Sequence, residues 1–241
     1  MTASEGPPGW VPVGVARTPF GQKLGVPRQP GLAPAARGSI HLFAPWGEGT
    51  VGLEGVSHLW VVFSFHLHQD HPPTPKVRPP RLGGEATLGV FATRSPYRPN
   101  GIGLSLVELL EVRRAPDGTA ELDVGGIDLV DGTPVLDLKP YVPWAECRPE
   151  ARLPWAEAPE PTLPVHLPPG LDPDLGRLLT EVLGQDPRPR HDRGDRTYGT
   201  RLAGHEVRFR VGPEGVSVLS VRPADGVGPG GSGRISDASV G

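Results

Sequence analysis

A short polar loop between two apolar runs carries the side chains that are best placed for chemistry in this sequence. Its polar residues are Arg94, Ser95, Arg98 and Asn100. Pro96 and Pro99 fix φ at about −65°, so the loop presents these groups from a stiff backbone. Two guanidinium groups in such a loop are suited to bind an anion, either a carboxylate or a phosphate. Tyr97, between them, can stack on an unpaired RNA base or pack in the core.

Carboxylates gather further along the chain. Asp128 stands just before the Asp131-Gly132 turn, at the expected end of a strand. There it can accept a hydrogen bond from a ligand, receive a proton, or cap the turn. Asp137 and Lys139 fall on one face of a later strand. They can form an ion pair or act as a base and an orienting cation, and the sequence leaves both possibilities open.

Histidines and basic residues share the loop at residues 66–84. His66, His68 and His71 have no helical or strand spacing that would set them as tetrahedral ligands, so we expect no metal site and a single ligand-facing histidine, His66. The basic residues of the loop can contact phosphates or form a solvated surface. They are Lys76, Arg78 and Arg81.

Composition limits the class of protein. The chain has 241 residues, of which 37% are hydrophobic and 21% charged, enough for one good core. With 34 Gly and 32 Pro, short strands and turns are favoured over long helices. The sequence has no apolar run long enough for a transmembrane helix, and Met1–Gly9 does not resemble a secretory signal. Because Cys147 is the single cysteine, an internal disulfide is excluded. We therefore expect a cytoplasmic protein that does not enter a membrane.

Charge is distributed unevenly along the chain. The net charge is −3, yet residues 16–100 carry nine Lys/Arg against four Asp/Glu, a balance of +5. Residues 101–150 carry four against ten, a balance of −6. A basic segment of this kind can attract a polyanion although the total charge is negative.

Short apolar runs separated by turn residues predict a mainly β fold. Strands are expected at 11–17, 36–42, 59–65, 88–92, 104–112, 120–124 and 135–138. Leu59, Val61, Phe63 and Phe65 alternate with period 2, and Asp117-Gly118 is a typical hairpin turn. The even spacing of about seven short strands predicts a closed or nearly closed β-barrel.

The remaining sequence suggests further regions. We expect a flexible N-terminus at 1–10, the barrel domain at 11–150 and a Pro-rich linker at 151–170. A small α+β domain is expected at 171–222, with a helix at 171–183 and strands at 199–210 and 216–221. The Gly/Ser-rich residues 223–241 are expected to be disordered.

Four separated motifs point to one family. They are Val-Ala-Arg-Thr-Pro-Phe (15–20) with Pro-Arg-Gln-Pro-Gly (27–31), Arg-Pro-Pro-Arg-Leu-Gly-Gly (78–84), the loop at 91–105, and Asp-Leu-Val-Asp-Gly-Thr-Pro-Val-Leu-Asp-Leu-Lys-Pro-Tyr (128–141). Together they resemble the TsaA-like family of tRNA methyltransferases, also called TrmO, over residues 11–150. Asp186-Pro187-Arg188-Pro189 matches the C-terminal extension of its bacterial members.

The resemblance implies a single-sheet β-barrel, distinct from a Rossmann sheet, that uses S-adenosyl-L-methionine. It implies methylation of N6 of N6-threonylcarbamoyladenosine at position 37, in the anticodon stem-loop of tRNA and typically of threonine tRNA. It also implies a homodimer with the cofactor near the subunit interface, for which Trp60 and Trp144 are possible anchors. A non-catalytic barrel that binds a nucleotide-like ligand, or a related enzyme with another substrate, are the alternatives.

The family's cofactor contacts fall by motif on two sets of positions. The first set is Pro27, Arg28, Gln29, His66, Leu67, Arg94 and Leu104, and the second is Gly125, Gly126, Ile127 and Asp128. The family often has His-Gln where this chain has His66-Leu67, so the second contact becomes a backbone contact or is lost. Gly101 replaces a proline of the family pattern and removes one constraint on φ. Methyl transfer to N6 then calls for a base near that nitrogen, and Asp128 is the first candidate. Asp137 is the next candidate base, with Lys139 as an orienting cation. Lys76, Arg78, Arg81, Tyr97 and Arg98 are the RNA-binding candidates.

Overall fold

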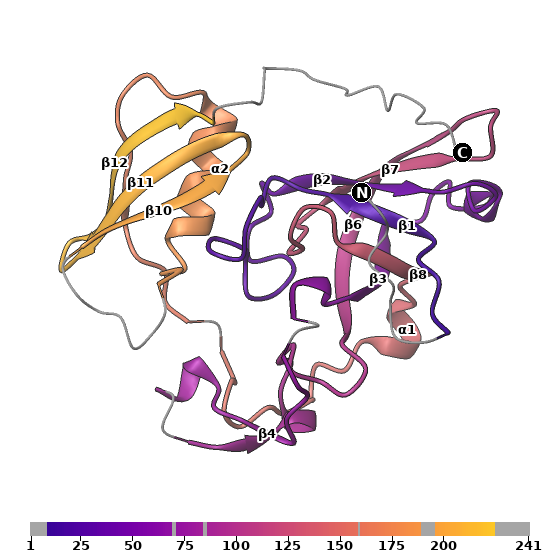
Figure 1. The fold of residues 1–241 in the computed structure, drawn as a ribbon, viewed down its shortest axis with the longest axis horizontal. Coiled ribbons are helices and arrows are strands. Elements are labelled where there is room, and N and C mark those ends of the chain that lie inside the picture. The colour runs from indigo at the N-terminus through magenta and orange to yellow at the C-terminus, as the bar shows by residue number, and fades with distance from the viewer. Residues whose placement is uncertain (1–8, 69–70, 84–85, 159, 189–195, 225–241) are drawn as a thin grey trace, which may run out of the picture.

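Six strands of the described residues close into an antiparallel barrel. The computed structural model describes residues 9–68, 71–83, 86–158, 160–188 and 196–224. The barrel strands are β1 (Gly14–Arg17), β2 (Arg37–Leu42), β3 (His58–Ser64), β6 (Ile102–Arg114), β7 (Ala120–Gly125) and β8 (Pro134–Pro140). Their order around the barrel is β1-β2-β7-β6-β3-β8, and β8 pairs with β1 to close it (Figure 1). The predicted mainly β, single-sheet barrel is confirmed.

Alternating side chains fill the barrel interior. On β3, Leu59 and Val61 are fully buried, whereas Trp60 and Val62 point the other way. On β7, Leu122 and Val124 are buried in the same alternation. The period-2 pattern of the sequence therefore determines which side chains form the core.

One predicted strand is wrong. Residues 88–92 were expected in the barrel, but β5 (Leu88–Gly89) pairs outside it with β4 (Lys76–Val77). Val90–Ala92 is a 3-10 helix whose buried residue is Val90. Because the apolar run holds only five residues, periodicity could not distinguish a strand from a helical turn there. The two short strands lie below the barrel in the view of Figure 1. Two further 3-10 helices, His66–His68 and Pro80–Leu82, lie in the expected long loop, and another spans Glu48–Thr50.

A second sheet and one longer helix form the C-terminal part. The sheet has the order β10-β11-β12-β9, with β9 (Val165–His166), β10 (Thr197–Leu202), β11 (His205–Gly212) and β12 (Gly215–Pro223). The predicted helix is found as α2 (Pro173–Leu183); Asp172 caps its N-terminus through the amides of Asp174 and Leu175. A short helix, α1 (Pro143–Glu146), follows the barrel. We call residues 163–188 together with 196–224 the C-terminal unit.

The single strand expected at residues 199–210 is wrong. The chain turns at Ala203 and Gly204, where φ is +48° and +72°, and this turn separates β10 from β11. Alanine rarely adopts positive φ, so the sequence carried no turn signal there. The expected linker at 151–170 contains β9, which pairs in parallel with β12. The expected N-terminal segment and the expected tail lie almost wholly outside the described residues.

The long loop between β1 and β2, residues 18–36, joins the barrel to the C-terminal unit. Phe20 forms an isolated β-bridge with Leu202, and the Ala203 amide donates to the Pro19 carbonyl at 2.8 Å. The Ala35 amide donates to Glu181 on α2 at 2.7 Å. Figure 1 shows α2 on the side of its sheet that faces the barrel. The conformation of this loop is thus fixed by contacts from both parts of the fold.

Candidate active site

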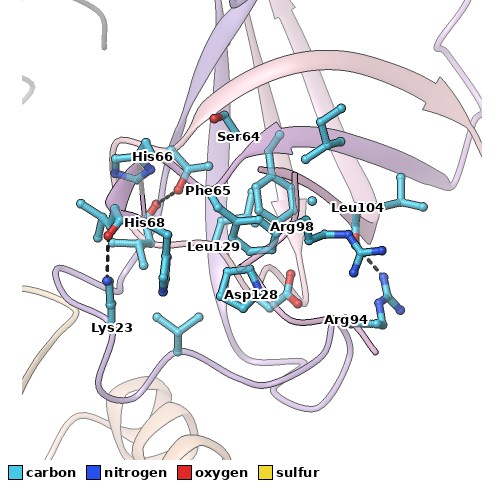
Figure 2. A pocket seen from close by; sticks show the side chains of 18 of the residues that line it. Lys23, Ser64, Phe65, His66, His68, Arg94, Arg98, Leu104, Asp128 and Leu129 are labelled. Carbon is cyan, nitrogen blue, oxygen red and sulfur yellow. Dashed lines mark hydrogen bonds between the residues drawn. The ribbon is translucent and has the colours of Figure 1, made fainter. Parts of the chain in front are cut away.

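A cavity of about 730 Å³ opens at the end of the barrel where β3 finishes and β6 begins. Its size suits a small organic ligand. Four segments surround it: the β1–β2 loop, the 3-10 helix after β3, the loop before β6 and the segment after β7 (Figure 2). The lining residues are Lys23, Val26, Pro27, Arg28, Gln29, Trp60, Phe63, Ser64, Phe65, His66, Leu67, His68, Thr93, Arg94, Pro96, Arg98, Ile102, Gly103, Leu104, Asp128, Leu129, Val130 and Thr133.

Two phenylalanine rings form an apolar wall of the cavity. Phe63 packs directly on the backbone of Gly103, where an added Cβ would lie 2.2 Å from its ring. Phe65 meets Phe63 edge-to-face with ring centroids 5.0 Å apart. Glycine is therefore required at position 103 by close approach, and the ring it admits faces the cavity.

Asp128 supplies the one carboxylate among the lining residues that the structure describes. It follows β7 after Gly126, whose φ of +68° turns the chain toward the barrel end. Its Oδ1 accepts a hydrogen bond from the Ser105 hydroxyl on β6. Burial raises the pKa of Asp128 to about 6, although Ser105 and Arg94 favour the charged form. A carboxyl group that titrates close to neutrality thus opens on the cavity.

Three cationic side chains of the cavity are held by hydrogen bonds to backbone carbonyls, and the charge of one of them, Arg94, acts on Asp128. The Arg94 guanidinium donates to the Leu104 carbonyl at 2.7 Å, and Arg98 donates to the Thr93 carbonyl at 2.8 Å (Figure 2). Lys23 donates to the Leu67 carbonyl at 2.8 Å. These bonds fix the positive groups in place, and a bound anion would not have to order them.

Arg28 connects the cavity to the C-terminal unit. It donates to Glu160 Oε2 at 2.5 Å and to the Asp186 carbonyl at 3.1 Å. Burial lowers its pKa, with the Arg81 charge nearby adding to this effect and Asp186 opposing it. The guanidinium is thus already engaged by the chain that follows the barrel.

The histidines of the site are held neutral. Burial lowers the pKa of His66 and lowers that of His68 to about 4. His68 also packs edge-to-face on Phe65 and on Tyr97, with centroids 6.2 and 5.4 Å away. Within the ranges that the structure describes, no three His, Cys, Asp or Glu side chains are arranged to hold a metal ion. These imidazoles therefore contribute shape and hydrogen bonding to the cavity.

Most of the cofactor candidates of the sequence come together in the cavity. Those that line it are Pro27, Arg28, Gln29, His66, Leu67, Arg94, Leu104 and Asp128. Gly125, Gly126 and Ile127 do not line it: Ile127 is fully buried in the core, and the Gly126 carbonyl accepts from the Gly31 amide at 3.2 Å. These three residues support the segment that delivers Asp128.

Two of the catalytic candidates lie elsewhere. Asp137 and Lys139 form an ion pair of 2.9 Å on β8, with side chains 49% and 65% exposed. Neither lines the cavity. Of the two roles that the sequence left open, the geometry shows the ion pair.

The RNA candidates have different surroundings in the structure. Arg98 lines the cavity, and Tyr97 is exposed beside His68 and His71. Lys76 on β4 and Arg78 are exposed. Arg81 instead donates to the Ala158 carbonyl, beyond the barrel. Lys76 and Arg78 thus remain accessible to a large ligand.

Sequence reasoning missed several residues of the site. Ser105 is the most informative, because it faces inward on β6, where the alternation of the strand calls for an apolar side chain. That interruption of the pattern was the available signal. Lys23, Thr93 and Phe65 carried no comparable signal, since each looked like an ordinary loop or strand residue.

Comparison with known proteins decides the family. The model of the tRNA-methyltransferase O N-terminal domain matches residues 15–147. The chain belongs to the tRNA-methyltransferase O family. The model of the TrmO C-terminal domain matches residues 165–224, so both parts of the fold have counterparts there.

Relatives of this TrmO family member extend over most of the chain. The tRNA (adenine(37)-N6)-methyltransferase of Escherichia coli K12 is 45% identical over 227 residues, covering 88% of this chain and 96% of its own. A putative S-adenosylmethionine-dependent methyltransferase, RcsF, of Pseudomonas aeruginosa is 43% identical over 230 residues, covering 89% and 97%. The crystal structure of TrmO from Pseudomonas aeruginosa superposes with a TM-score of 0.71 at 39% identity, covering 88% of this chain and 96% of that one.

Proposed function

We propose that this protein is a tRNA methyltransferase that transfers a methyl group from S-adenosyl-L-methionine to N6 of adenosine 37. The observation that carries the proposal is the cavity at the barrel end, which a largely buried carboxyl group, hydrogen-bonded cations and an aromatic wall line together in a TrmO family member. The test is transfer of labelled methyl from S-adenosylmethionine to tRNA by the purified protein. Binding of the cofactor without transfer would favour a non-catalytic ligand-binding barrel.

The cavity residues fit the cofactor. Its methionine carboxylate needs a cation, and Arg94 and Arg98 are held at the cavity with their guanidinium groups fixed. Its adenine needs an apolar slot, which Phe63 and Phe65 provide. The cofactor, when bound, supplies a methyl group activated by a sulfonium. Leu104, exposed at the rim, and the Pro27–Gln29 segment would cover it from either side.

Asp128 is placed to act as the general base. The nitrogen that is methylated in a threonylcarbamoylated adenosine belongs to a urea-type group whose lone pair is poorly available, so removal of its proton aids the reaction. A carboxyl group with a pKa of about 6 is mostly ionised at pH 7 and still basic enough to accept that proton. We therefore assign the proton-accepting role to Asp128.

The assignment of Asp128 is tested by Asp128→Asn, which keeps the shape of the side chain and removes the charge. We expect kcat at saturating cofactor and tRNA to fall about 10²- to 10⁴-fold while the affinity for tRNA stays near that of the wild type. Asp137→Asn is the matched control, because that carboxylate lies outside the cavity in an exposed ion pair. Full activity of Asp128→Asn would show that Asp128 is a turn residue and not the base.

We propose that the anticodon stem-loop approaches over the 76–98 segment. Lys76 and Arg78 are exposed, within the basic stretch of the sequence. Contacts from such side chains to phosphates release counterions and make binding dependent on salt. Tyr97, 37% exposed, can stack on an unpaired base.

The finer substrate is also a proposal. Resemblance to the family favours N6-threonylcarbamoyladenosine at position 37, in threonine tRNA, in the cytoplasm. Mass spectrometry of nucleosides from each purified tRNA species, with and without the gene, would identify both the nucleoside and the tRNA. If the methylated nucleoside appeared in a different tRNA, the proposed tRNA species would be wrong and the proposed nucleoside would stand.

We propose that two copies associate through the outward face of β3 and β6. Two neighbouring cross-strand pairs of that face are apolar: Val62 lies opposite Leu104 and Trp60 opposite Leu106. Leu104 is 44% exposed, and Trp60 and Leu104 also line the cavity. Trp144 on α1 is 87% exposed and offers a further anchor. A second copy on this face would bury these side chains and close one side of the cavity.

A further inference from the structure

Ser105 is a hydroxyl inside an otherwise apolar strand face. It lies on β6 between the inward-facing Gly103 and Val107, and its register partner on β3 is the buried Val61. The residue is fully buried. A buried hydroxyl lowers stability unless it is hydrogen-bonded, so an alanine would serve the barrel core at least as well.

The Ser105 hydroxyl is hydrogen-bonded to Asp128, a residue of another segment. It donates to Asp128 Oδ1, and no second side chain is hydrogen-bonded to this carboxylate within the part of the chain that the structure describes. Because Asp128 lines the cavity, fixing Oδ1 toward the barrel interior leaves Oδ2 for a ligand. Figure 2 shows the Asp128 carboxyl group among the cavity side chains, between Phe65, Arg98 and Arg94.

We propose that Ser105 is a positioning residue for methyl transfer, which holds the Asp128 carboxylate with one oxygen aimed at the reacting nitrogen. The inference rests on the proposed function of Asp128 as the base. A carboxylate that rotates freely would present its lone pair to N6 in only part of its conformations. A donor buried in the barrel wall removes that freedom without occupying the cavity.

The hydroxyl also favours the charged form of the base. Ser105 donates only to the ionised carboxyl or to its carbonyl oxygen, so losing this bond raises the pKa of Asp128 further above its present value of about 6. A base must be deprotonated to act. Loss of the Ser105 hydroxyl should therefore shift the acidic limb of the pH–rate profile to higher pH.

Other titratable groups face the same cavity and must be separated from Asp128. They are Lys23 and Arg28 of the β1–β2 loop, His66 and His68 after β3, and Arg94 and Arg98 before β6. His66 has a lowered pKa and is the group that could produce an acidic limb of its own. The Ser105 hydroxyl is bonded to Asp128 and not to His66, so a change at position 105 moves the limb only if Asp128 produces it.

The test compares pH–rate profiles of the full-length protein under saturating S-adenosylmethionine and tRNA. In Ser105→Ala and in the nearly isosteric Ser105→Cys, a weak donor, we expect the acidic limb of kcat to shift up by about one pH unit. At pH 6, kcat should then fall several-fold, and KM for tRNA should stay unchanged. Ser105→Thr restores the hydroxyl and should return the limb to its original pH. Thr180→Val is the control: it also removes a threonine hydroxyl, one that donates to the Gly176 carbonyl of α2 and does not line the cavity, so its limb should stay in place.

The outcomes separate this inference from the function of Asp128. An acidic limb that stays at the wild-type pH in folded Ser105→Ala and Ser105→Cys, while Asp128→Asn is inactive, overturns the role of Ser105 alone. Full activity in Asp128→Asn would instead show that the base was assigned wrongly. A shifted limb that Ser105→Thr restores supports the proposal, since a purely structural role would lower activity without moving the limb.

Discussion

Asp128→Asn should stabilise the protein against unfolding at neutral pH. The carboxyl group has an ordinary pKa of 3.8, which burial raises to about 6 in the folded state. At about 1.4 kcal/mol per pH unit, that difference corresponds to about 3 kcal/mol of folding free energy that the ionised group costs. Because the carboxyl opens on the cavity, we take this as an upper bound. Asparagine avoids the cost and keeps an oxygen that can accept from Ser105.

The raised pKa of Asp128 determines how the stability difference between Asp128→Asn and the wild type depends on pH. Below about pH 4 both the folded and the unfolded states bind the proton, so the wild type and Asp128→Asn should be equally stable. Between pH 4 and pH 6 the folded wild type binds more protons than the unfolded chain, and its stability falls as the pH rises. The advantage of Asp128→Asn should therefore appear across this interval and stay constant above pH 6.

Urea unfolding at a series of pH values, followed by circular dichroism and tryptophan fluorescence, measures the difference in free energy directly. Asp123→Asn is the matched control with the opposite sign. The pKa of Asp123 is lowered, chiefly by its hydrogen bonds with Arg113, so its neutralisation should not stabilise the protein at neutral pH. Equal stability of Asp128→Asn and the wild type at pH 7, or a difference that does not change with pH, would refute the reasoning.

Three further predictions concern the cofactor, the tRNA and the assembly. Arg94→Ala should weaken S-adenosylmethionine binding by about 1.5 to 3 kcal/mol, the usual value of a charge-assisted hydrogen bond; unchanged affinity in calorimetry would remove Arg94 from the site. Lys76→Ala or Arg78→Ala should raise KM for tRNA and flatten its dependence on salt while cofactor affinity is unaffected, and a uniform loss of kcat would argue against phosphate contacts. In sedimentation, Val62→Asp should convert the dimer, with twice the 25.5 kDa mass of one chain, into the monomer. Leu219→Asp, an equally radical change at an exposed residue of β12, should leave the dimer intact. A monomeric wild type would contradict the proposed interface.

The barrel was predictable because the patterns that specify its strands and turns lie within short stretches of sequence. Residues 59–63 and 120–124 alternate between buried and half-buried side chains, and Asp117-Gly118 supplies the hairpin between β6 and β7, with Gly118 at a φ of +83°. The strand predicted at 88–92 was wrong because this run lacks such a local signal. Its five residues are apolar without a period, and the tertiary surroundings decided between a strand and a 3-10 helix.

The site was only partly predictable because its geometry is not local. The family motifs pointed to Arg94, Leu104 and Asp128, which the fold brings to one cavity. The contact between Ser105 and Asp128 joins two strand regions whose proximity depends on the pairing of β6 with β7 and on the turn at Gly126. No pattern within either segment encodes that distance. The engagement of Arg28 by Glu160 and Asp186 depends in the same way on how the C-terminal unit docks.

The loop between β1 and β2 has a consequence for how the protein is made. Residues 23–29 of this loop form one wall of the cavity, yet the strand that bridges it begins at residue 197. Chains are synthesised from the N-terminus at about 5–20 residues per second and fold region by region, so the barrel can close well before its loop has a partner. A nascent chain halted after the barrel would expose the Pro19 carbonyl and the Ala35 amide to water and leave that wall unordered. Tight binding of the cofactor would then arise late, when β10 and α2 reach the loop, and the nascent barrel would bind it weakly.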